Sequence, residues 1–352
     1  MDFKQYLEQS RGRIKKHLRK YCKFKKAENI PFLFKEQQLI ESLEDFVMRG
    51  KLLRGSLFLF TLESFGKKIN NEHLDISCAI ELMHSALLVQ DDIIDRDFTR
   101  RGNKTIFAKY MQDGEKIGAY DPYHYGVSTG IMVADVAFFF AIDLLSNYSG
   151  KSLSIMLKYY AHEVYLVSLA ESADSIFGQT SKEPTKEEIY DVYKYKTARY
   201  TFSLPFEMGS IVADASIDLR ESLNLLGELV GIIFQLKDDE IGIFGSEDLI
   251  GKPVGSDIRE NKKTILRHLL YNKASNSDKK VLDACFGNNN AGQRETDIVK
   301  NLYEKYNISA LINQEISEIM EKVWVIYKKL DLKVEYKRIL KDLLDFNLKR
   351  SF

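Results

Sequence analysis

The sequence predicts an all-α fold, a single large helical bundle over residues 1–352. Only five prolines occur in the chain, and the segments between them are long. In several of these segments apolar residues recur at positions i, i+3, i+4 and i+7, the spacing of one face of an α-helix. Alternating strand-like segments with Asn-Gly or Asp-Gly turns are not evident, and no repeat of fixed period is found. With 45% hydrophobic residues, the chain can bury a large core.

A basic helix is the first element that the sequence predicts, within residues 1–30. Residues 11–26 carry nine Lys or Arg and no acidic residue. The apolar residues at helical spacing in this segment are Ile14, Leu18, Tyr21 and Phe24. We interpret the segment as a terminal helix that docks its apolar stripe on the body of the protein and turns its lysines to water. The alternative is a helix that makes a weak contact with a membrane surface.

Further helices are predicted from apolar periodicity over residues 76–90, 131–145 and 223–241. Residues 110–126, which contain glycines and a proline, are predicted to form an internal loop. The most apolar stretch, residues 130–145, contains two aspartates and is too short to span a bilayer comfortably, so a soluble protein without a transmembrane segment is expected. Residues 287–352 show the pattern of C-terminal helices.

The charges and cysteines exclude some classes of protein. Lys plus Arg equals Asp plus Glu at 51 each, so no global field favours nucleic acid as a partner. The three cysteines are widely spaced and give neither a disulfide framework nor a zinc pattern. A cytoplasmic location fits this composition, and the N-terminus lacks the apolar core of a signal peptide.

Three carboxylates are concentrated at the end of an apolar helix, at Asp91, Asp92 and Asp95. Asp91 and Asp95 stand one helical turn apart on one face, where unpaired like charges repel. Hard oxygen ligands of this kind suit Mg²⁺, which takes one or two carboxylates together with phosphate oxygens from a substrate. Arg100 and Arg101 lie just downstream and supply planar guanidinium groups that bind phosphate. This motif predicts a metal together with a diphosphate.

A second acidic pair, Asp238 and Asp239, also ends an apolar run. Two helices of this kind that face each other across a deep central cavity would build a site for several metal ions. The alternative interpretation is that each acidic cluster is a solvated helix end or cap. The presence of two clusters with basic partners favours the metal site.

The residues that look functional occur in a fixed order along the chain. They are Gly50, Lys51, Arg54, His84, Asp91, Asp92, Asp95, Arg100, Arg101, Lys196, Thr197, Gln235, Asp238, Asp239, Lys252 and Lys262. In order and spacing this set resembles the trans-isoprenyl (polyprenyl) diphosphate synthases, from about Gly50 to Thr264. Beyond residue 286 the resemblance is reduced to the helical pattern.

The resemblance implies a fold of the isoprenoid synthase type and an enzyme that joins an allylic diphosphate head-to-tail to isopentenyl diphosphate. It also implies a homodimer. The expected ligands of Mg²⁺, with three ions per active site, are Asp91, Asp95 and Asp238, supported by Asp92 and Asp239. The groups expected to bind the departing allylic diphosphate are Arg100, Lys196, Lys252 and Lys262.

The resemblance assigns a second anion site to isopentenyl diphosphate. The residues expected there are Gly50, Lys51, Arg54, His84 and Arg101. Thr197 and Gln235 are expected to present oxygen atoms to the carbocation and to the metal shell. Taken singly these residues have plainer interpretations, with Lys51 and Arg54 at an exposed helix start, His84 in the core and Lys196 on a solvated face. The joint pattern favours the functional interpretation.

The chain departs from the family pattern in its second motif, where Gly242 stands in place of the third aspartate. Ser181 and Lys182 also occupy positions where the family often has an aspartate. A non-catalytic partner subunit of a heteromeric synthase is therefore one rival interpretation. A class I terpene cyclase is another, although a cyclase needs no second diphosphate site.

Product length is predicted from the residues that precede the first acidic motif. Ala86 and Leu87 lie about one turn, roughly 5.4 Å, below Asp91, which is close to one isoprene unit. Neither is aromatic, so a growing tail can pass, with Met83 deeper along the same wall. The three phenylalanines at positions 138–140 are a candidate floor. We predict geranylgeranyl diphosphate as the product, with farnesyl or longer diphosphates as alternatives.

Overall fold

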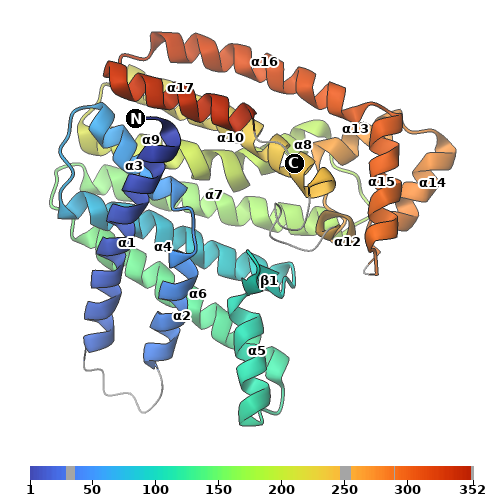
Figure 1. The fold of residues 1–352 in the computed structure, drawn as a ribbon, viewed down its shortest axis with the longest axis horizontal. Coiled ribbons are helices and arrows are strands. Elements are labelled where there is room, and N and C mark those ends of the chain that lie inside the picture. The colour runs from blue at the N-terminus through green and yellow to red at the C-terminus, as the bar shows by residue number, and fades with distance from the viewer. Residues whose placement is uncertain (29–35, 246–254, 289, 350–352) are drawn as a thin grey trace. The chain divides into compact units, whose positions relative to one another are not determined.

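The computed structural model describes residues 1–28, 36–245, 255–288 and 290–349, and regular structure in them is almost entirely helical (Figure 1). The strands in these residues are one short antiparallel pair, β1 (Thr99–Arg100) and β2 (Asn103–Lys104). The prediction of an all-α fold is confirmed.

The predicted helices at 76–90, 131–145 and 223–241 lie inside α4, α6 and α10. In chain order the elements are α1 (Phe3–Ala27), α2 (Glu36–Met48), α3 (Leu53–Ser64), α4 (Asn71–Ile94), α5 (Ile106–Ile117), α6 (Pro122–Ser146), α7 (Leu153–Gln179), α8 (Lys186–Val192), η1 (Tyr193–Ser203), α9 (Leu204–Ala213), α10 (Ile217–Phe244), α12 (Ser256–Arg259), α13 (Ile265–Lys273), α14 (Asn276–Cys285), α15 (Gln293–Lys305), α16 (Ile308–Lys329) and α17 (Val334–Leu348). The element η1 is a π-helix, a rare form in which each N–H reaches back five residues and which is frequent at functional sites.

The chain forms two compact units, each with its own core. Unit 1 contains Met1–Leu157, Gly209–Asp214 and Lys333–Ile339. Unit 2 contains Lys158–Met208, Ala215–Leu332 and Leu340–Phe352. The buried apolar side chains of unit 1 include Leu43, Phe58, Ile76 and Leu82, and those of unit 2 include Phe202, Leu226, Ile233 and Ile312.

The basic N-terminal helix α1 docks on unit 1 along one stripe. The buried residues of this stripe include Phe3, Tyr6, Ile14, Leu18 and Cys22. Beside it, Arg13 Nη1 pairs with Glu63 Oε1 at 2.7 Å. The docked interpretation of this segment is confirmed. Phe24 was predicted in the stripe but is 62% exposed, because it lies on the side of the helix opposite Cys22.

α4 is the central helix of unit 1 and packs against α3 and α6. Its first turn is capped by the Asn70 side chain, which accepts a hydrogen bond from the His73 N–H. Glycines on α6 let its neighbours approach closely. A Cβ at Gly126 would lie 2.4 Å from the Phe107 carbonyl oxygen, so only glycine fits at this crossing of α5 and α6.

The internal loop predicted over residues 110–126 is wrong, because only residues 118–121 connect α5 to α6. Gly118 ends α5 in the left-handed region, with φ of 73°, as glycines after helices commonly do. Gly114 lies inside α5, where a Cβ would be 2.9 Å from Tyr125 Cδ1. The glycine pattern reflects close packing of helix on helix as well as a turn, and sequence alone does not separate the two.

One helix within the described part of the chain, α6, is long and apolar enough to cross a membrane by length and composition. α6 is longer than residues 130–145, the apolar stretch predicted to be too short to span a bilayer. In its most apolar window 39% of the residues are buried inside the protein, and small residues such as Ala134 and Ala137 form the buried face. An inner helix of a soluble protein passes the same test, so α6 alone is weak support for a membrane span.

α10 is the central helix of unit 2 and packs against η1 and α16. At two glycines of α10, the backbone of this helix lies directly against the backbone of η1. A Cβ at Gly231 would lie 2.3 Å from Ala198 Cα, and one at Gly227 would lie 2.7 Å from the Ser203 nitrogen. Real side chains do not fit at such distances, so both positions require glycine and η1 is held directly against α10.

Candidate active site

The first acidic motif ends α4 in unit 1, and its aspartates differ in exposure. Asp92 is buried, whereas Asp91 and Asp95 are partly exposed. Arg100 reaches two of them from β1, with its Nε 2.6 Å from Asp92 Oδ1 and its Nη2 2.9 Å from Asp91 Oδ2. The repulsion predicted within the motif is therefore offset in part by a cation of the chain itself. Asp91 and Asp95 still place two carboxylates on consecutive turns, where they can bind a further cation.

Basic residues predicted to bind a second diphosphate lie together in unit 1. A Cβ at Gly50 would lie 3.6 Å from Arg101 Nη1, which places this guanidinium beside the turn that precedes α3. Arg101 occupies the β1–β2 turn with a φ of 53°, in the left-handed region. Lys51 is exposed, and Arg54 follows in the first turn of α3. The turn and the first residues of α3 thus supply cations on one side of unit 1.

His84 on α4 belongs to the same group. Burial lowers the pKa of His84 well below its ordinary value, and the charges of Arg54, Arg101 and Arg100 lower it further. Burial and the charges of three guanidinium groups thus favour the neutral imidazole. A neutral imidazole can donate one hydrogen bond to a diphosphate without adding to the crowded positive charge. This setting favours a role in anion binding over that of an ordinary core histidine.

Glu81 in this group was missed by the sequence analysis. It lies one turn before His84 on α4, is 2% exposed, and accepts a hydrogen bond from the Gly55 N–H at 2.7 Å. The signal available in the sequence was a glutamate within the apolar part of a predicted helix, three residues before His84. A carboxylate is seldom buried unless it is paired.

Lys196 lies on η1 in unit 2 and is held by two carboxylates of α7. Its Nζ lies 2.6 Å from Asp174 Oδ2 and 3.0 Å from Glu171 Oε2. These two acids were also missed, because nothing in the sequence links them to a lysine on another helix. Lys196 is therefore not the solvated lysine of the plainer interpretation. Thr197 follows it on η1 and is half-buried.

The second acidic motif, on α10 of unit 2, has one inward and one outward aspartate. Asp239 is buried and accepts hydrogen bonds from the Tyr193 hydroxyl and, at 2.7 Å, from Gln235 Nε2. The Tyr193 oxygen in turn accepts the Ile265 N–H at 2.9 Å. Burial raises the pKa of Asp239 well above its ordinary value. Asp238 is exposed and is the carboxylate of the pair that can reach a metal.

Two predicted lysines follow the second motif. Lys262 pairs with Glu260 at 3.0 Å and lies 3.8 Å from Asp257 Oδ1. Lys252 lies outside the described residues. Lys262 was predicted to bind the allylic diphosphate, and it is already paired with two acidic residues of unit 2.

The donor atoms in both units fit Mg²⁺. Asp91 and Asp95 in unit 1 and Asp238 in unit 2 are partly or fully exposed carboxylates, the hard oxygen ligands that Mg²⁺ prefers. Cationic side chains that suit the phosphate oxygens of a substrate accompany these carboxylates in each unit, with Arg100 in unit 1 and Lys196 in unit 2. The arrangement is suited to a diphosphate substrate.

Comparison with known proteins identifies the family. The chain matches the polyprenyl synthetase family over residues 36–306, across most of its length and in both units. The chain belongs to this family. This polyprenyl synthetase is a prenyl diphosphate synthase, a transferase of prenyl groups.

Several relatives of this polyprenyl synthetase have assigned activities or solved structures. It is 29% identical over 263 residues to a geranylgeranyl diphosphate synthase of Saccharolobus solfataricus, with 75% of each chain covered. It is 30% identical over 248 residues to a short chain isoprenyl diphosphate synthase of Methanocaldococcus jannaschii, with 70% of each chain covered. A geranylgeranyl pyrophosphate synthase of Corynebacterium glutamicum, solved with isoprenyl diphosphate and magnesium, is 26% identical with a TM-score of 0.89 over the full length of both chains.

The glycine that replaces the third aspartate in the second motif of this polyprenyl synthetase faces another carboxylate. A Cβ at Gly242 would lie 2.8 Å from Asp257 Oδ2, an atom of α12 in the same unit. The space that a side chain at position 242 would need is thus occupied by the Asp257 carboxylate. The second motif therefore has a third aspartate, Asp257, beside it in space, although its own sequence has glycine in that place.

Restoring the usual family motif should harm this polyprenyl synthetase. We expect Gly242→Asp to destabilise the fold by about 1 kcal/mol, because the Asp257 carboxylate must move away from the new Cβ and is repelled by the new charge. Thermal unfolding and turnover measure the effect. The double variant Gly242→Asp with Asp257→Ala should recover stability, whereas a fully stable and active Gly242→Asp protein would refute this account.

The residues predicted to set product length are buried to different degrees. Met83 and Ala86 are buried on α4, and Leu87 is half-buried. The floor predicted at positions 138–140 is wrong for Phe139 and stays a prediction for the other two rings. Phe139 is 68% exposed, and Phe140 packs edge-on against Tyr21 with ring centroids 5.3 Å apart. Apolar character was a poor guide here, since one face of α6 is exposed.

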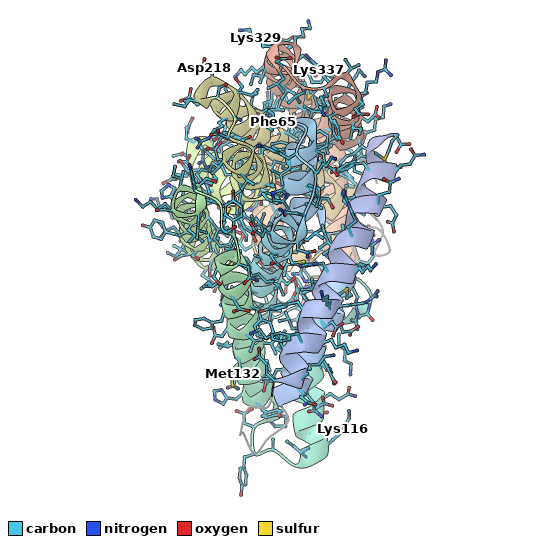
Figure 2. The ribbon with its side chains drawn as sticks, turned by 90° about the vertical axis from the view of Figure 1, so that its left-hand side faces the viewer. Phe65, Lys116, Met132, Asp218, Lys329 and Lys337 are labelled. Carbon is cyan, nitrogen blue, oxygen red and sulfur yellow. The ribbon has the colours of Figure 1, made fainter. Side chains whose placement is uncertain are left out.

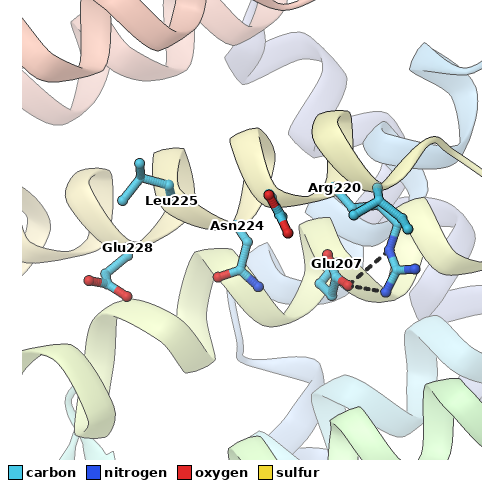
Figure 3. A pocket seen from close by; sticks show the side chains of 7 residues that line it. Glu207, Arg220, Asn224, Leu225 and Glu228 are labelled. Atoms are coloured by element: carbon cyan, nitrogen blue, oxygen red, sulfur yellow. Dashed lines mark hydrogen bonds and ion pairs between the residues drawn. The ribbon is translucent and has the colours of Figure 1, made fainter.

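A hollow of about 480 Å³ opens in unit 2 (Figure 3). It is lined by Glu207, Ile217, Arg220, Glu221, Asn224, Leu225 and Glu228. Its charges are largely paired, since Glu207 accepts from Arg220 Nε at 3.0 Å and Glu228 pairs with Lys194 at 2.8 Å. None of the motif residues within the described part of the chain lines it.

Proposed function

We propose that this polyprenyl synthetase is a Mg²⁺-dependent enzyme that joins an allylic diphosphate head-to-tail to isopentenyl diphosphate. The observation that carries the proposal is that unit 1 contains two groups of charged side chains whose chemistry suits a diphosphate. Asp91 and Asp95 with Arg100 suit a diphosphate that is bound through metal ions. Arg54 and Arg101 suit a second diphosphate that is bound by the side chains without metal. Two diphosphates held by one unit make the reaction of their chains effectively intramolecular.

The chemistry of the proposed reaction places negative charge on the departing allylic diphosphate. Asp91 and Asp95 of unit 1 and Asp238 of unit 2 would hold Mg²⁺, with three ions per site, and the metal would supply positive charge for this leaving group. Arg100 and Lys196 contribute cationic hydrogen-bond donors for the same oxygens. No base beyond the released diphosphate is required to remove the final proton.

An assay of chain elongation tests this function. The purified enzyme is incubated with Mg²⁺, isopentenyl diphosphate and, in turn, allylic diphosphates of five, ten and fifteen carbons, and the products are sized. A longer prenyl diphosphate supports the proposal. A cyclic hydrocarbon or alcohol would identify a class I terpene cyclase instead, and no product without a second protein would identify a partner subunit.

We propose a twenty-carbon product, geranylgeranyl diphosphate. The absence of an aromatic ring at Ala86 and Leu87 supports this length, as do relatives from Saccharolobus solfataricus and Methanosarcina mazei that are named geranylgeranyl diphosphate synthases. Leu87→Phe and Ala86→Phe should shorten the product to fifteen carbons by blocking the tail. Because Ala86 is fully buried, its variant should also lose about 1–3 kcal/mol of stability.

The control for this prediction is Leu88→Phe, which makes the same change about 100° around the helix. Its product should keep the length of the wild-type product. An active Leu87→Phe enzyme with unchanged products would show that this wall does not measure the chain.

We propose a homodimer, supported by apolar side chains exposed on two helices. Those on α6 are Ile131, Met132, Phe139 and Ile142, of which Met132 is labelled in Figure 2. Those on α7 are Tyr165, Leu169 and Ile176. Exposed apolar residues repeated along a helix are typical of surfaces that bind another protein.

Light scattering tests the dimer. The wild-type protein should have the mass of two chains, and Phe139→Lys should shift it toward one chain because a charge would be buried at the interface. Val334→Lys, at a similarly exposed apolar residue of α17 in unit 1, should leave the mass unchanged. A wild-type monomer would contradict the dimer.

We further propose that the chain acts as one domain in the cytoplasm without a nucleic-acid partner. The family match spans residues 36–306 and therefore parts of both units. The three cysteines are buried free thiols, as a reducing compartment allows.

A further inference from the structure

The helix that carries Arg54 begins without a cap of its own. α3 starts at Leu53, and the preceding Leu52 lies in the left-handed region, with φ of 52° and no side-chain hydrogen bond to the helix. The first N–H groups of a helix have no partner within the helix and must find one elsewhere. The start of α3 is therefore fixed by groups outside the helix.

Glu81 of α4 supplies one such partner. Its Oε1 accepts the Gly55 N–H at 2.7 Å, and this N–H belongs to the peptide that joins Arg54 to Gly55. A carboxylate at a helix N-terminus also interacts favourably with the helix dipole. The buried carboxylate thus holds the backbone at the point where the Arg54 side chain begins.

The contact depends on glycine at position 55. A Cβ there would lie 2.7 Å from Ser77 Oγ, 2.8 Å from the Ser77 carbonyl oxygen and 3.1 Å from Glu81 Cγ. α3 and α4 therefore approach closely at this crossing, and Glu81 reaches the α3 backbone because no side chain intervenes. The first turn of α3 is held against α4 at Gly55 by this contact.

Glu81 carries the wrong charge to attract a diphosphate, so its role is to orient the neighbouring cationic groups. Burial raises the pKa of Glu81, while its hydrogen bond to Gly55 and the charges of Arg54 and Arg101 act in the opposite direction. A carboxylate within this group reduces the local positive charge and on that ground would weaken diphosphate binding. Its presence in a cationic site is explained if holding the arginines in place strengthens diphosphate binding more than the negative charge of Glu81 weakens it.

We infer that Glu81 is a positioning residue for isopentenyl diphosphate, which fixes the start of α3 so that Arg54 is aligned with Arg101 and His84. This inference rests on the proposed function, since it assigns the second diphosphate to these cations. The residue acts through Arg54 and the Gly55 peptide and has no contact with the reacting atoms.

Steady-state kinetics of three variants test the inference. Glu81→Ala should raise KM for isopentenyl diphosphate by about 10- to 100-fold, the effect of one charge-assisted hydrogen bond, and leave KM for the allylic substrate within about 3-fold. Glu81→Gln keeps an acceptor for the Gly55 N–H and should stay within about 3-fold of the wild type. Ser77→Ala, one turn earlier in the same crossing, is the matched control for packing and should change neither KM.

Binding measurements separate a failure of the inference from a failure of the proposed function. Calorimetric titration with isopentenyl diphosphate and with inorganic diphosphate, without metal, should show weaker binding to Glu81→Ala than to the wild type. If the wild type binds inorganic diphosphate but not isopentenyl diphosphate, the proposed function fails, while weaker diphosphate binding to the variant still supports the positioning role.

Other outcomes overturn the inference. Unchanged or tighter binding of both ligands to Glu81→Ala, or an equal rise in both KM values, would show that Glu81 does not position this site. If Glu81→Ala does not fold, Glu81→Asp decides. Its carboxylate is one methylene too short to reach the Gly55 N–H and should raise KM for isopentenyl diphosphate alone, and a wild-type KM in that variant would refute the role.

Discussion

Alanine at Asp91 or at Asp238 should lower turnover by about 10²- to 10³-fold, the usual cost of removing one group that stabilises charge in the transition state. Both aspartates are proposed to hold the Mg²⁺ that neutralises the departing diphosphate. The fold should survive, because neither side chain is buried and each lies near the end of its helix. Turnover with saturating substrates measures the effect, and circular dichroism should show nearly unchanged helix content.

The control for this prediction is Asp218→Ala, which removes an exposed carboxylate from the first turn of α10, far along the helix from Asp238. It should keep wild-type turnover. Asp239 should behave differently from Asp238, since it links Tyr193 and Gln235 inside unit 2, and its loss should lower stability as well as rate. Normal turnover in Asp91→Ala, or full activity in a chelator, would refute the metal assignment.

Substitutions in the two anion sites should separate the two substrates. Lys51→Ala, Arg54→Ala and His84→Ala should raise KM for isopentenyl diphosphate by about 10- to 100-fold with smaller effects on the allylic substrate. Arg100→Ala should act mainly on the allylic substrate. Initial rates measured with one substrate varied and the other saturating give both KM values. Equal effects on both substrates in every variant would contradict the two-site assignment.

Arg100 is expected to have a second effect in this experiment. It pairs with Asp91 and Asp92, so Arg100→Ala also removes the chain's own counter-ion from the first motif. The requirement for Mg²⁺ should therefore rise in this variant. Lys252→Ala is expected to resemble Arg100→Ala in its effect on the allylic substrate without this change in the metal requirement.

The long helices could be predicted from the sequence because their apolar residues follow the helical period. α4, α6 and α10 each carry such a stripe over many turns, and propensity and burial agree there. The connection between α5 and α6 could not be predicted, because Gly114 marks a close helix crossing and Gly118 marks a turn. Both appear in the sequence as the same residue type.

The candidate site was predictable where its residues lie close together in the sequence. Asp91 and Arg100 belong to one short segment, and the structure pairs them. The partners of Lys196 could not be foreseen, since Glu171 and Asp174 reach it from another helix. Glu81 was missed for a related reason, because its partner is a backbone N–H, and every residue but proline has one.

The backbone contact between α10 and η1 also bears on how this enzyme can evolve. At Gly227 and Gly231 the backbone of α10 lies directly against η1, and neither position has a side chain whose size could be changed in small steps. Mutation at these two positions therefore cannot change in small steps the distance between η1, which carries Lys196, and α10, which carries Asp238. Natural or laboratory variants that alter rate or preference must arise elsewhere, on surfaces such as the α7 face that meets Lys196, where side chains can be exchanged one at a time.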